Sequence, residues 1–339
     1  RVPGVRLLVG GLAAAVALAV VFTLLIGVPA AGPAGARELL LAAAAGSEAE
    51  RTEGRYTRYE TETGDVVEVG TSLRPYKMLA RATHATWYPA FSGGDGRQVH
   101  RRLGAWPASD EDAAAWRAAG SPVTMPSLCS HGKVHKRGVL VERSGQRCAE
   151  LDTRPQERAT TARTTGDLAA YPRSHPGLDV GELSADPARL REQLLASTRS
   201  GGLGGPVEGD AARLWAAVNV ALFQPEQPLS PRVRAAAYRI MADLPGVRLL
   251  GEVEDARGRK GQAFTRASEE SAGVAGTSRI IIDPDSGLPL AQEGYDRPDG
   301  ALTGYTLVLA CGPADSTPAQ HVTEARRPQP DAERVPAGR

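Results

Sequence analysis

Four side chains in the middle of the chain carry the donor atoms of a zinc site. Cys129, His131, His135 and Cys148 offer two thiolates and two imidazoles, a set that suits tetrahedral Zn²⁺. Their C-x-H-x3-H spacing and distant second cysteine match no standard zinc-finger pattern. In an oxidising compartment the two cysteines form a disulfide more readily, and closing that loop stabilises a chain by roughly 3 kcal/mol. We therefore predict a Cys129–Cys148 disulfide, with no metal and no other cofactor.

Motifs for hydrolysis and for phosphate binding are missing from the sequence. It contains no G-x-S-x-G elbow and no H-E-x-x-H pair. The glycine cluster at residues 201–205 lacks the Lys-Ser/Thr of a phosphate-binding loop, so it is typical of a flexible linker. The sequence thus predicts no catalytic residue. A hydrolase whose groups meet only in the fold is the alternative.

Large aromatic side chains are the candidates for lining a ligand cavity. Trp87, Phe91, Trp215 and Phe223 are of the type that lines apolar pockets. Aromatic residues also dominate ordinary cores, and we favour that interpretation for most of them. Cys311 lies near the end of an apolar strand, where we expect a buried thiol.

The first apolar segment predicts a helix that spans a membrane. Residues 7–28 carry no charge, and at about 1.5 Å per residue they cover roughly 33 Å, the thickness of a bilayer core. Arg1 and Arg6 precede the span without an acidic neighbour, so the positive-inside rule places the N-terminus in the cytoplasm. The alternative is a signal peptide cleaved near Ala36, at the end of an A-x-A sequence.

The residues around this span complete the predicted topology. Because the chain starts with Arg1 and not Met, we expect residues 1–6 to be the remnant of a longer cytoplasmic segment. Residues 29–36 are rich in Pro, Gly and Ala and form a stalk. Everything after it lies outside the cytoplasm, at the cell membrane. The charges nearly cancel, with 40 Lys plus Arg against 39 Asp plus Glu, which argues against a nucleic acid partner.

The order of the expected elements predicts an α+β domain over residues 37–311. An alanine-rich helix at 37–50 precedes strands at 56–69, 77–91 and 97–103, and helices fill much of 186–244. A long, mostly loop-like insertion covers 107–181, and the tail 312–339 reads as disordered. The last part is a meander of about five strands between residues 248 and 310. We expect a curved antiparallel sheet, a half-barrel that wraps a helical layer.

One turn in this meander is especially well specified. Asp283, Pro284 and Gly287 belong to an Asp-Pro-Asp-Ser-Gly sequence. Proline presets the first turn residue, and glycine accepts a positive φ. A tight turn between two strands is therefore predicted here.

Four stretches of the second half carry a resemblance to a known family. They are Pro228 to Tyr238, Leu244 to Val247, Leu249 to Val253 and Ile281 to Leu290. The chain resembles an uncharacterised family of actinobacterial membrane-anchored proteins, best over residues 183–295. Members of that family look like the lipoprotein carrier LolA, whose curved half-barrel wraps helices and can enclose an apolar cavity. Relatives of that fold bind lipids or sense envelope damage for an anti-sigma factor, and the resemblance implies no catalytic motif.

These expectations combine into two functional hypotheses. The first is a non-enzymatic, membrane-anchored binding or sensor module outside the cytoplasm, whose ligand is a lipid or the acyl chain of a lipoprotein. The second is a regulatory subunit of the cell envelope that contacts another envelope protein and takes no small molecule. A filled apolar cavity would separate them.

Overall fold

The structure, a computed structural model, places most of the region after the first apolar segment. It describes residues 33–71, 73–90, 94–126, 133–136, 139–142, 150–163, 180–199, 209–223, 228–266, 277–296 and 300–318. The predicted membrane span at 7–28 and residues 319–339 of the tail predicted at 312–339 lie outside the described residues, while residues 312–314 belong to the strand Leu302–Ala314. No helix within the described ranges is long and apolar enough to cross a membrane.

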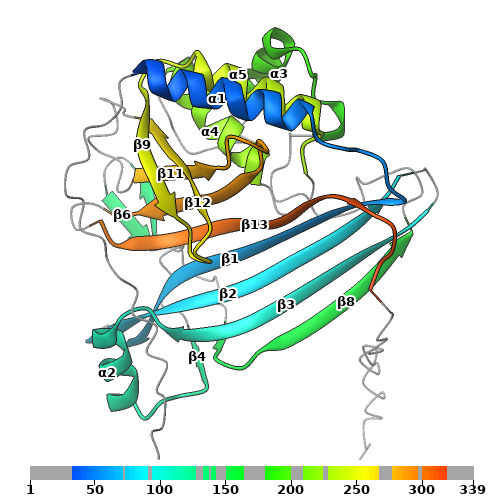
Figure 1. Cartoon of the computed structure of the whole chain (residues 1–339). Coiled ribbons are helices and arrows are strands. Elements are labelled where there is room, and N and C mark those ends of the chain that lie inside the picture. Colours follow the sequence, from blue (N-terminus) through cyan, green and yellow to red (C-terminus); the bar gives the residue numbers. More distant parts are fainter. Residues whose placement is uncertain are drawn as a thin grey trace, which may run out of the picture.

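A nine-stranded antiparallel sheet forms the framework of the molecule (Figure 1). Its strand order is β8-β3-β2-β1-β13-β12-β11-β10-β9, so the first strand of the domain lies beside the last. Two smaller sheets pair β4 with β7 and β5 with β6. The strands are β1 (Tyr56–Thr71), β2 (Arg74–Pro89), β3 (Asp95–Pro107), β4 (Thr124–Pro126), β5 (Lys133–Lys136), β6 (Val139–Glu142), β7 (Glu150–Asp152), β8 (Gln156–Arg163), β9 (Val247–Glu254), β10 (Lys260–Arg266), β11 (Thr277–Ile282), β12 (Pro289–Tyr295) and β13 (Leu302–Ala314).

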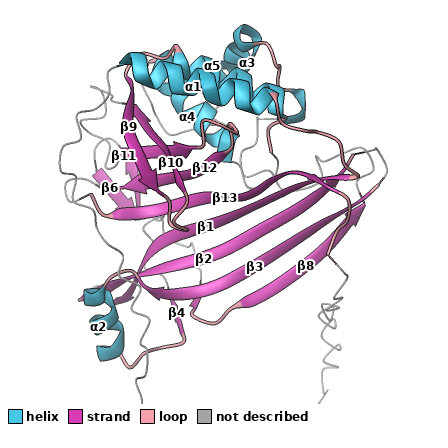
Figure 2. Cartoon of the chain, viewed as in Figure 1, coloured by secondary structure: helices cyan, strands magenta, loops and turns pink. Residues whose placement is uncertain are grey.

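The longest hairpin of the sheet explains why one half of the sheet extends past the helices. β1 and β2 have 16 residues each and pair without a break from Tyr56 opposite Pro89 to Thr71 opposite Arg74. Both strands contain several Thr and Tyr residues, and β1 also has three Val residues, all of which fit a pleated and half-buried surface. β1, β2, β3 and β8 therefore extend well beyond the helices (Figure 2).

The helices gather over the other half of the sheet, above β9 to β13 (Figure 2). They are α1 (Pro33–Glu48), α3 (Pro187–Arg199), α4 (Asp210–Phe223) and α5 (Pro231–Ala242), while α2 (Asp110–Ala118) lies apart. Ser230 caps α5 with its hydroxyl, which accepts from the Val233 N–H, and proline occupies the first turn. Asp186 caps α3 in the same way through the Arg189 N–H. A three-residue 3-10 turn, η3, covers Val180–Glu182.

The main core lies between these helices and the sheet. Its members include Leu40, Leu214, Tyr238, Phe264 and Ile280, all almost completely buried. A second cluster, around Ile281 and Leu307, packs on the other side of β10 to β13. The sheet therefore buries apolar side chains on both of its faces in this half.

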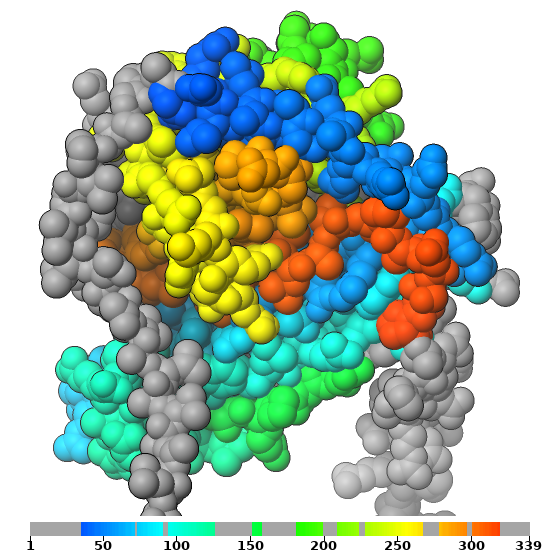
Figure 3. Space-filling model, viewed as in Figure 1, coloured from blue at the N-terminus to red at the C-terminus, as the bar shows by residue number. Residues whose placement is uncertain are grey.

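The turn between β11 and β12 locks the helical layer to the sheet. Gly287 adopts φ +67°, and a Cβ there would lie 2.1 Å from the Ala43 carbonyl oxygen of α1. The Tyr238 hydroxyl and the Ser47 hydroxyl both donate to the Gly287 carbonyl, at 3.0 and 3.1 Å. Figure 3 shows this turn, in orange, directly against α1, in blue. Glycine is required here for close approach as well as for its backbone conformation.

The α+β class and the curved antiparallel sheet are confirmed, and so is the meander of five strands at the end. The expectation of a loop region over 107–181 was wrong at residues 156–163. They form β8, which pairs with β3 and is an edge of the main sheet. Its sequence, QERATTAR, lacks the large apolar side chains whose alternation would have indicated a strand.

Candidate functional site

The two faces of the β1–β2–β3 half differ in what they carry. One face, here called the helix-side face, includes Tyr59 and Tyr88, whose rings belong to the main core beneath the helices. The other, here called the opposite face, includes Glu62 and Trp87. Directly paired residues of antiparallel strands share a face, so the register assigns every other side chain.

The helix-side face is lined by hydroxyl and imidazole groups. Tyr59 pairs with Thr86, and Thr61 pairs with His84, which in turn pairs with His100 of β3. The two histidine rings lie with their centroids 4.3 Å apart. These five residues form one continuous patch across three strands, which we call the hydroxyl–histidine patch.

Two hydroxyls of this patch are buried without a hydrogen-bond partner. Thr61 is completely buried and Thr86 is 4% exposed, yet neither Oγ1 atom meets a donor or acceptor. The Oδ1 atom of Asn219, on α4, is also buried and unpaired, although its amide nitrogen donates to the Trp215 carbonyl at 2.7 Å. Buried polar atoms normally find partners, because leaving one without a bond is costly. Unpaired hydroxyls therefore mark a place where a ligand can add bonds.

The environment of His84 favours its neutral state. Burial, together with the neighbouring His100, lowers the pKa of His84 to about 4. A neutral imidazole both donates and accepts a hydrogen bond, so at neutral pH His84 adds to the hydrogen-bonding capacity of the patch.

A second polar group joins the helices to the sheet beside Tyr59. Arg234 of α5 is 2% exposed, pairs with Glu50 and donates to the Ser47 hydroxyl at 3.1 Å. It also lies 3.8 Å from the thiol of Cys311, which sits opposite Tyr59 on β13. Cys311 is half-buried, and burial raises the pKa of its thiol to about 11. A thiol that stays protonated is a poor nucleophile, so this group is structural.

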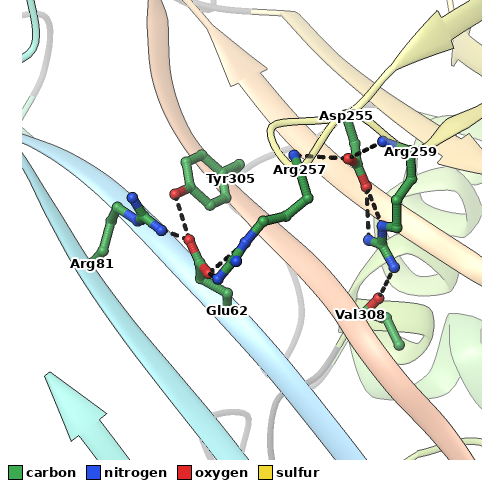
Figure 4. A network of polar contacts seen from close by, with 7 residues as sticks. All are labelled: Glu62, Arg81, Asp255, Arg257, Arg259, Tyr305 and Val308. Carbon is green, nitrogen blue, oxygen red and sulfur yellow. Dashed lines mark hydrogen bonds and ion pairs between the residues drawn. The ribbon is translucent and has the colours of Figure 1, made fainter. Parts of the chain in front are cut away.

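Glu62, on the opposite face, is the centre of a network that holds distant strands together (Figure 4). Its carboxylate is 1% exposed and accepts from Arg81 at 2.8 Å, from the Tyr305 hydroxyl at 2.9 Å and from Arg257. Burial works against ionisation, but hydrogen bonds from Arg257, Arg81 and Tyr305 outweigh it and hold the pKa of Glu62 below its usual value. These three partners hold the carboxylate in place between the strands.

The same network secures the β9–β10 turn. Asp255 accepts from the guanidinium of Arg259 at 2.7 Å, and Arg259 then donates to the carbonyls of Val308 and Leu290, at 2.6 and 3.0 Å. Arg257, from this turn, reaches across β13 to Glu62 on β1 (Figure 4). The network thus pins the far hairpin over the middle of the sheet.

The predicted site residues fall in separate places. Trp215 and Phe223 belong to the main core, whereas Trp87 lies in a small cluster with Ala85 and Val99 on the opposite face. The structure does not bring Trp87 together with the two α4 aromatics. Phe91, Cys129 and Cys148 lie outside the described residues, and so does His131. Asp283, Pro284 and Gly287 form a turn in which the Gly287 N–H donates to the Asp283 carbonyl at 2.9 Å.

Sequence reasoning missed the hydroxyl–histidine patch and the Glu62 network. Threonine and tyrosine are common in any strand, so Thr61 and Thr86 gave no signal of their own. Glu62 gave a weak signal, since a carboxylate at an inward position of a strand requires hydrogen-bond or ion-pair partners. Among the described residues no group of three or more His, Cys, Asp or Glu side chains is arranged to hold a metal ion.

Comparison with solved structures gives distant likenesses, among them two structures that contain MucB. No protein-family model matches the chain, and no curated protein does. The crystal structure of MucB matches 85% of this chain and 62% of its own, at 15% identity and a TM-score of 0.27. The complex of Pseudomonas aeruginosa MucA and MucB matches 83% of this chain and 59% of its own, at 15% identity and a TM-score of 0.25.

This chain spans less than two thirds of either MucB chain. TM-scores of this size say nothing about what the chain binds. Membership of an actinobacterial membrane-anchored family stays a prediction.

Proposed function

We propose that this chain is a non-enzymatic binding module whose ligand lies against the helix-side face of β1 and β2. The observation that carries the proposal is the pair of buried, unpartnered hydroxyls of Thr61 and Thr86. A ligand with hydrogen-bonding groups would satisfy them, and the neighbouring rings of Tyr59 and Tyr88 would contact its apolar part. An amphiphile such as a lipid or a lipoprotein acyl chain has this combination.

The setting of the module is part of the proposal. The apolar span at residues 7–28 would hold the domain at the outer side of the cytoplasmic membrane. A tethered module cannot carry its ligand far from the membrane. We therefore favour a sensor, which reports a bound ligand to the membrane or to a cytoplasmic segment, over a carrier.

A second candidate function is supported by the edge of the sheet. Among the described strands β8 pairs with β3 alone in the main sheet, and a strand at the end of a sheet can add an extended segment of another protein. Under this alternative the chain is a regulatory subunit of the cell envelope and needs no small ligand.

The test is to measure how much lipid copurifies with matched variants of the full chain, extracted in mild detergent. The double variant Thr61→Val, Thr86→Val keeps side-chain volume and removes both hydroxyls. The control is Thr83→Val, since Thr83 is also buried on β2, at 8% exposed, but lies on the opposite face. At about 1 kcal/mol for each of the two hydrogen bonds, the double variant should bind its lipid roughly thirtyfold more weakly.

Two outcomes decide between the candidates. Loss of lipid in the double variant, with full occupancy in the Thr83→Val control, would support the binding module. Equal lipid content in all three proteins would contradict it. A wild-type chain that carries no lipid and gains none from envelope extracts would favour the regulatory subunit.

A further inference from the structure

Arg97 differs from the other buried arginine of the described residues. It is 7% exposed, forms no ion pair, and its Nε atom is buried without a hydrogen-bond partner. Arg234, which is 2% exposed, pairs with Glu50 and bonds to Ser47. A guanidinium cannot lose its proton, so burial without an anion is costly. The contrast indicates that the partner of Arg97 is a bound ligand.

The sheet register places Arg97 in a row of three side chains on the opposite face. Trp87 of β2 pairs with Arg97 of β3 on one side and with Arg58 of β1 on the other. The guanidinium carbon of Arg58 lies 5.7 Å from the centre of the Trp87 ring, and Arg58 also forms an ion pair with Glu60. Glu60 is therefore already engaged and leaves Arg97 without a counterion. The row thus places Trp87 between two arginine residues, and the Arg58 guanidinium lies over its ring.

The surroundings specify the chemistry of that ligand. Ala85 and Val99 form a buried apolar cluster with Trp87, and Tyr56 packs against it. Guanidinium groups bind oxyanions through paired hydrogen bonds, and a phosphate offers more acceptor oxygens than a carboxylate. The row thus combines a charged anchor with an apolar floor.

We propose that Arg97, with Arg58 and Trp87, forms an anion site for a phosphate group, either free or carried on an apolar body as in a lipid headgroup. The site lies on the other side of the sheet from the hydroxyl–histidine patch. It does not depend on the function proposed above, and either can fail without the other.

The test uses the full chain in a mild non-ionic detergent. Tryptophan emission and melting temperature are followed during titration with inorganic phosphate and, separately, with dihexanoylphosphatidylglycerol. Arg97→Gln removes the charge, and Arg101→Gln is the matched control, because Arg101 lies on the same strand and face but is exposed and paired with Glu157. Trp87→Phe identifies which emission change comes from the site.

We expect saturable binding that raises the melting temperature of the wild-type chain. Arg97→Gln should weaken it by about tenfold or more, the usual effect of removing a charged hydrogen bond, and Arg101→Gln should change it by less than about twofold. Saturation by phosphate alone would identify a free anion, and saturation by the phospholipid alone would identify a headgroup. The proposal is overturned if neither titrant binds, or if Arg97→Gln and Arg101→Gln lose the same affinity.

Discussion

Buried charged side chains connect the β1–β2–β3 half of the sheet to the β9–β13 half. Glu62 lies on β1, and its partners come from β2, from β13 and from the β9–β10 turn. The carboxylate is almost fully buried, whereas Arg81 and Arg257 keep 23% and 44% of their side-chain surface exposed. The partners' contact with solvent weakens each attraction, but the buried anion cannot do without them.

Replacing Glu62 tests this joint. Glu62→Gln keeps the volume and removes the charge, so we expect a loss of about 2 kcal/mol in the free energy of unfolding, less than for a fully buried ion pair. Glu157→Gln is the control, because Glu157 forms an exposed pair with Arg101 and should cost at most about 1 kcal/mol. Urea unfolding at neutral pH measures both. Equal losses would mean that the network adds nothing beyond a surface pair.

The hydroxyl–histidine patch predicts how the free energy of unfolding depends on pH. The pKa of His84 is lowered in the folded state to about 4, from an ordinary value of 6.5, so protons bind the unfolded chain more tightly. The contribution of neutral His84 to the free energy of unfolding is present above pH 6.5 and is lost as the pH falls from 6.5 towards 4. Urea unfolding between pH 7 and pH 4 should show this decline, and His84→Gln should flatten it. An identical decline in the variant would assign it to other groups.

Elements joined by backbone contact give the clearest test of packing. Gly287 and Gly258 both have a positive φ, but a Cβ at Gly287 would meet α1 while a Cβ at Gly258 would meet nothing within 4 Å. We expect Gly258→Ala to cost about 1 kcal/mol for the backbone conformation alone, and Gly287→Ala to cost at least about 3 kcal/mol because α1 must also move. Thermal or urea unfolding distinguishes the two, and equal costs would show that the turn is not docked on α1.

Much of the element pattern could be predicted because its signals are local. Helices were predicted over much of 186–244, and α3, α4 and α5 lie within that range. The strands β1, β2 and β3 were located to within a few residues. β8 was missed because its side chains show no apolar alternation.

The order of the strands and the candidate site could not be predicted from local signals. Pairing of β1 with β13 joins residues that are about 250 positions apart, as in Tyr59 opposite Cys311. Such pairings depend on the packed fold and leave no mark on either segment. The same holds for Thr61, Thr86 and Arg97, whose importance comes from burial without partners and not from residue type.

At the scale of the whole molecule, the helical layer covers β9 to β13, and the long strands β1, β2, β3 and β8 extend past it (Figure 2). One half of the molecule is a packed core, with apolar clusters on both faces of the sheet. The other half has smaller apolar clusters and carries the hydroxyl–histidine patch and the Arg97 row, where the Thr61 and Thr86 hydroxyls and the Arg97 Nε atom are buried without partners. We infer that the first half supplies stability and the second half supplies binding.

The most direct test of this account is the native mass of the full chain, released from mild detergent after expression with export to an oxidising compartment. We expect a reproducible added mass that disappears on denaturation and that solvent extraction identifies as a lipid. A mass equal to that of the protein alone, unchanged after incubation with envelope lipids, would contradict a binding module of this kind.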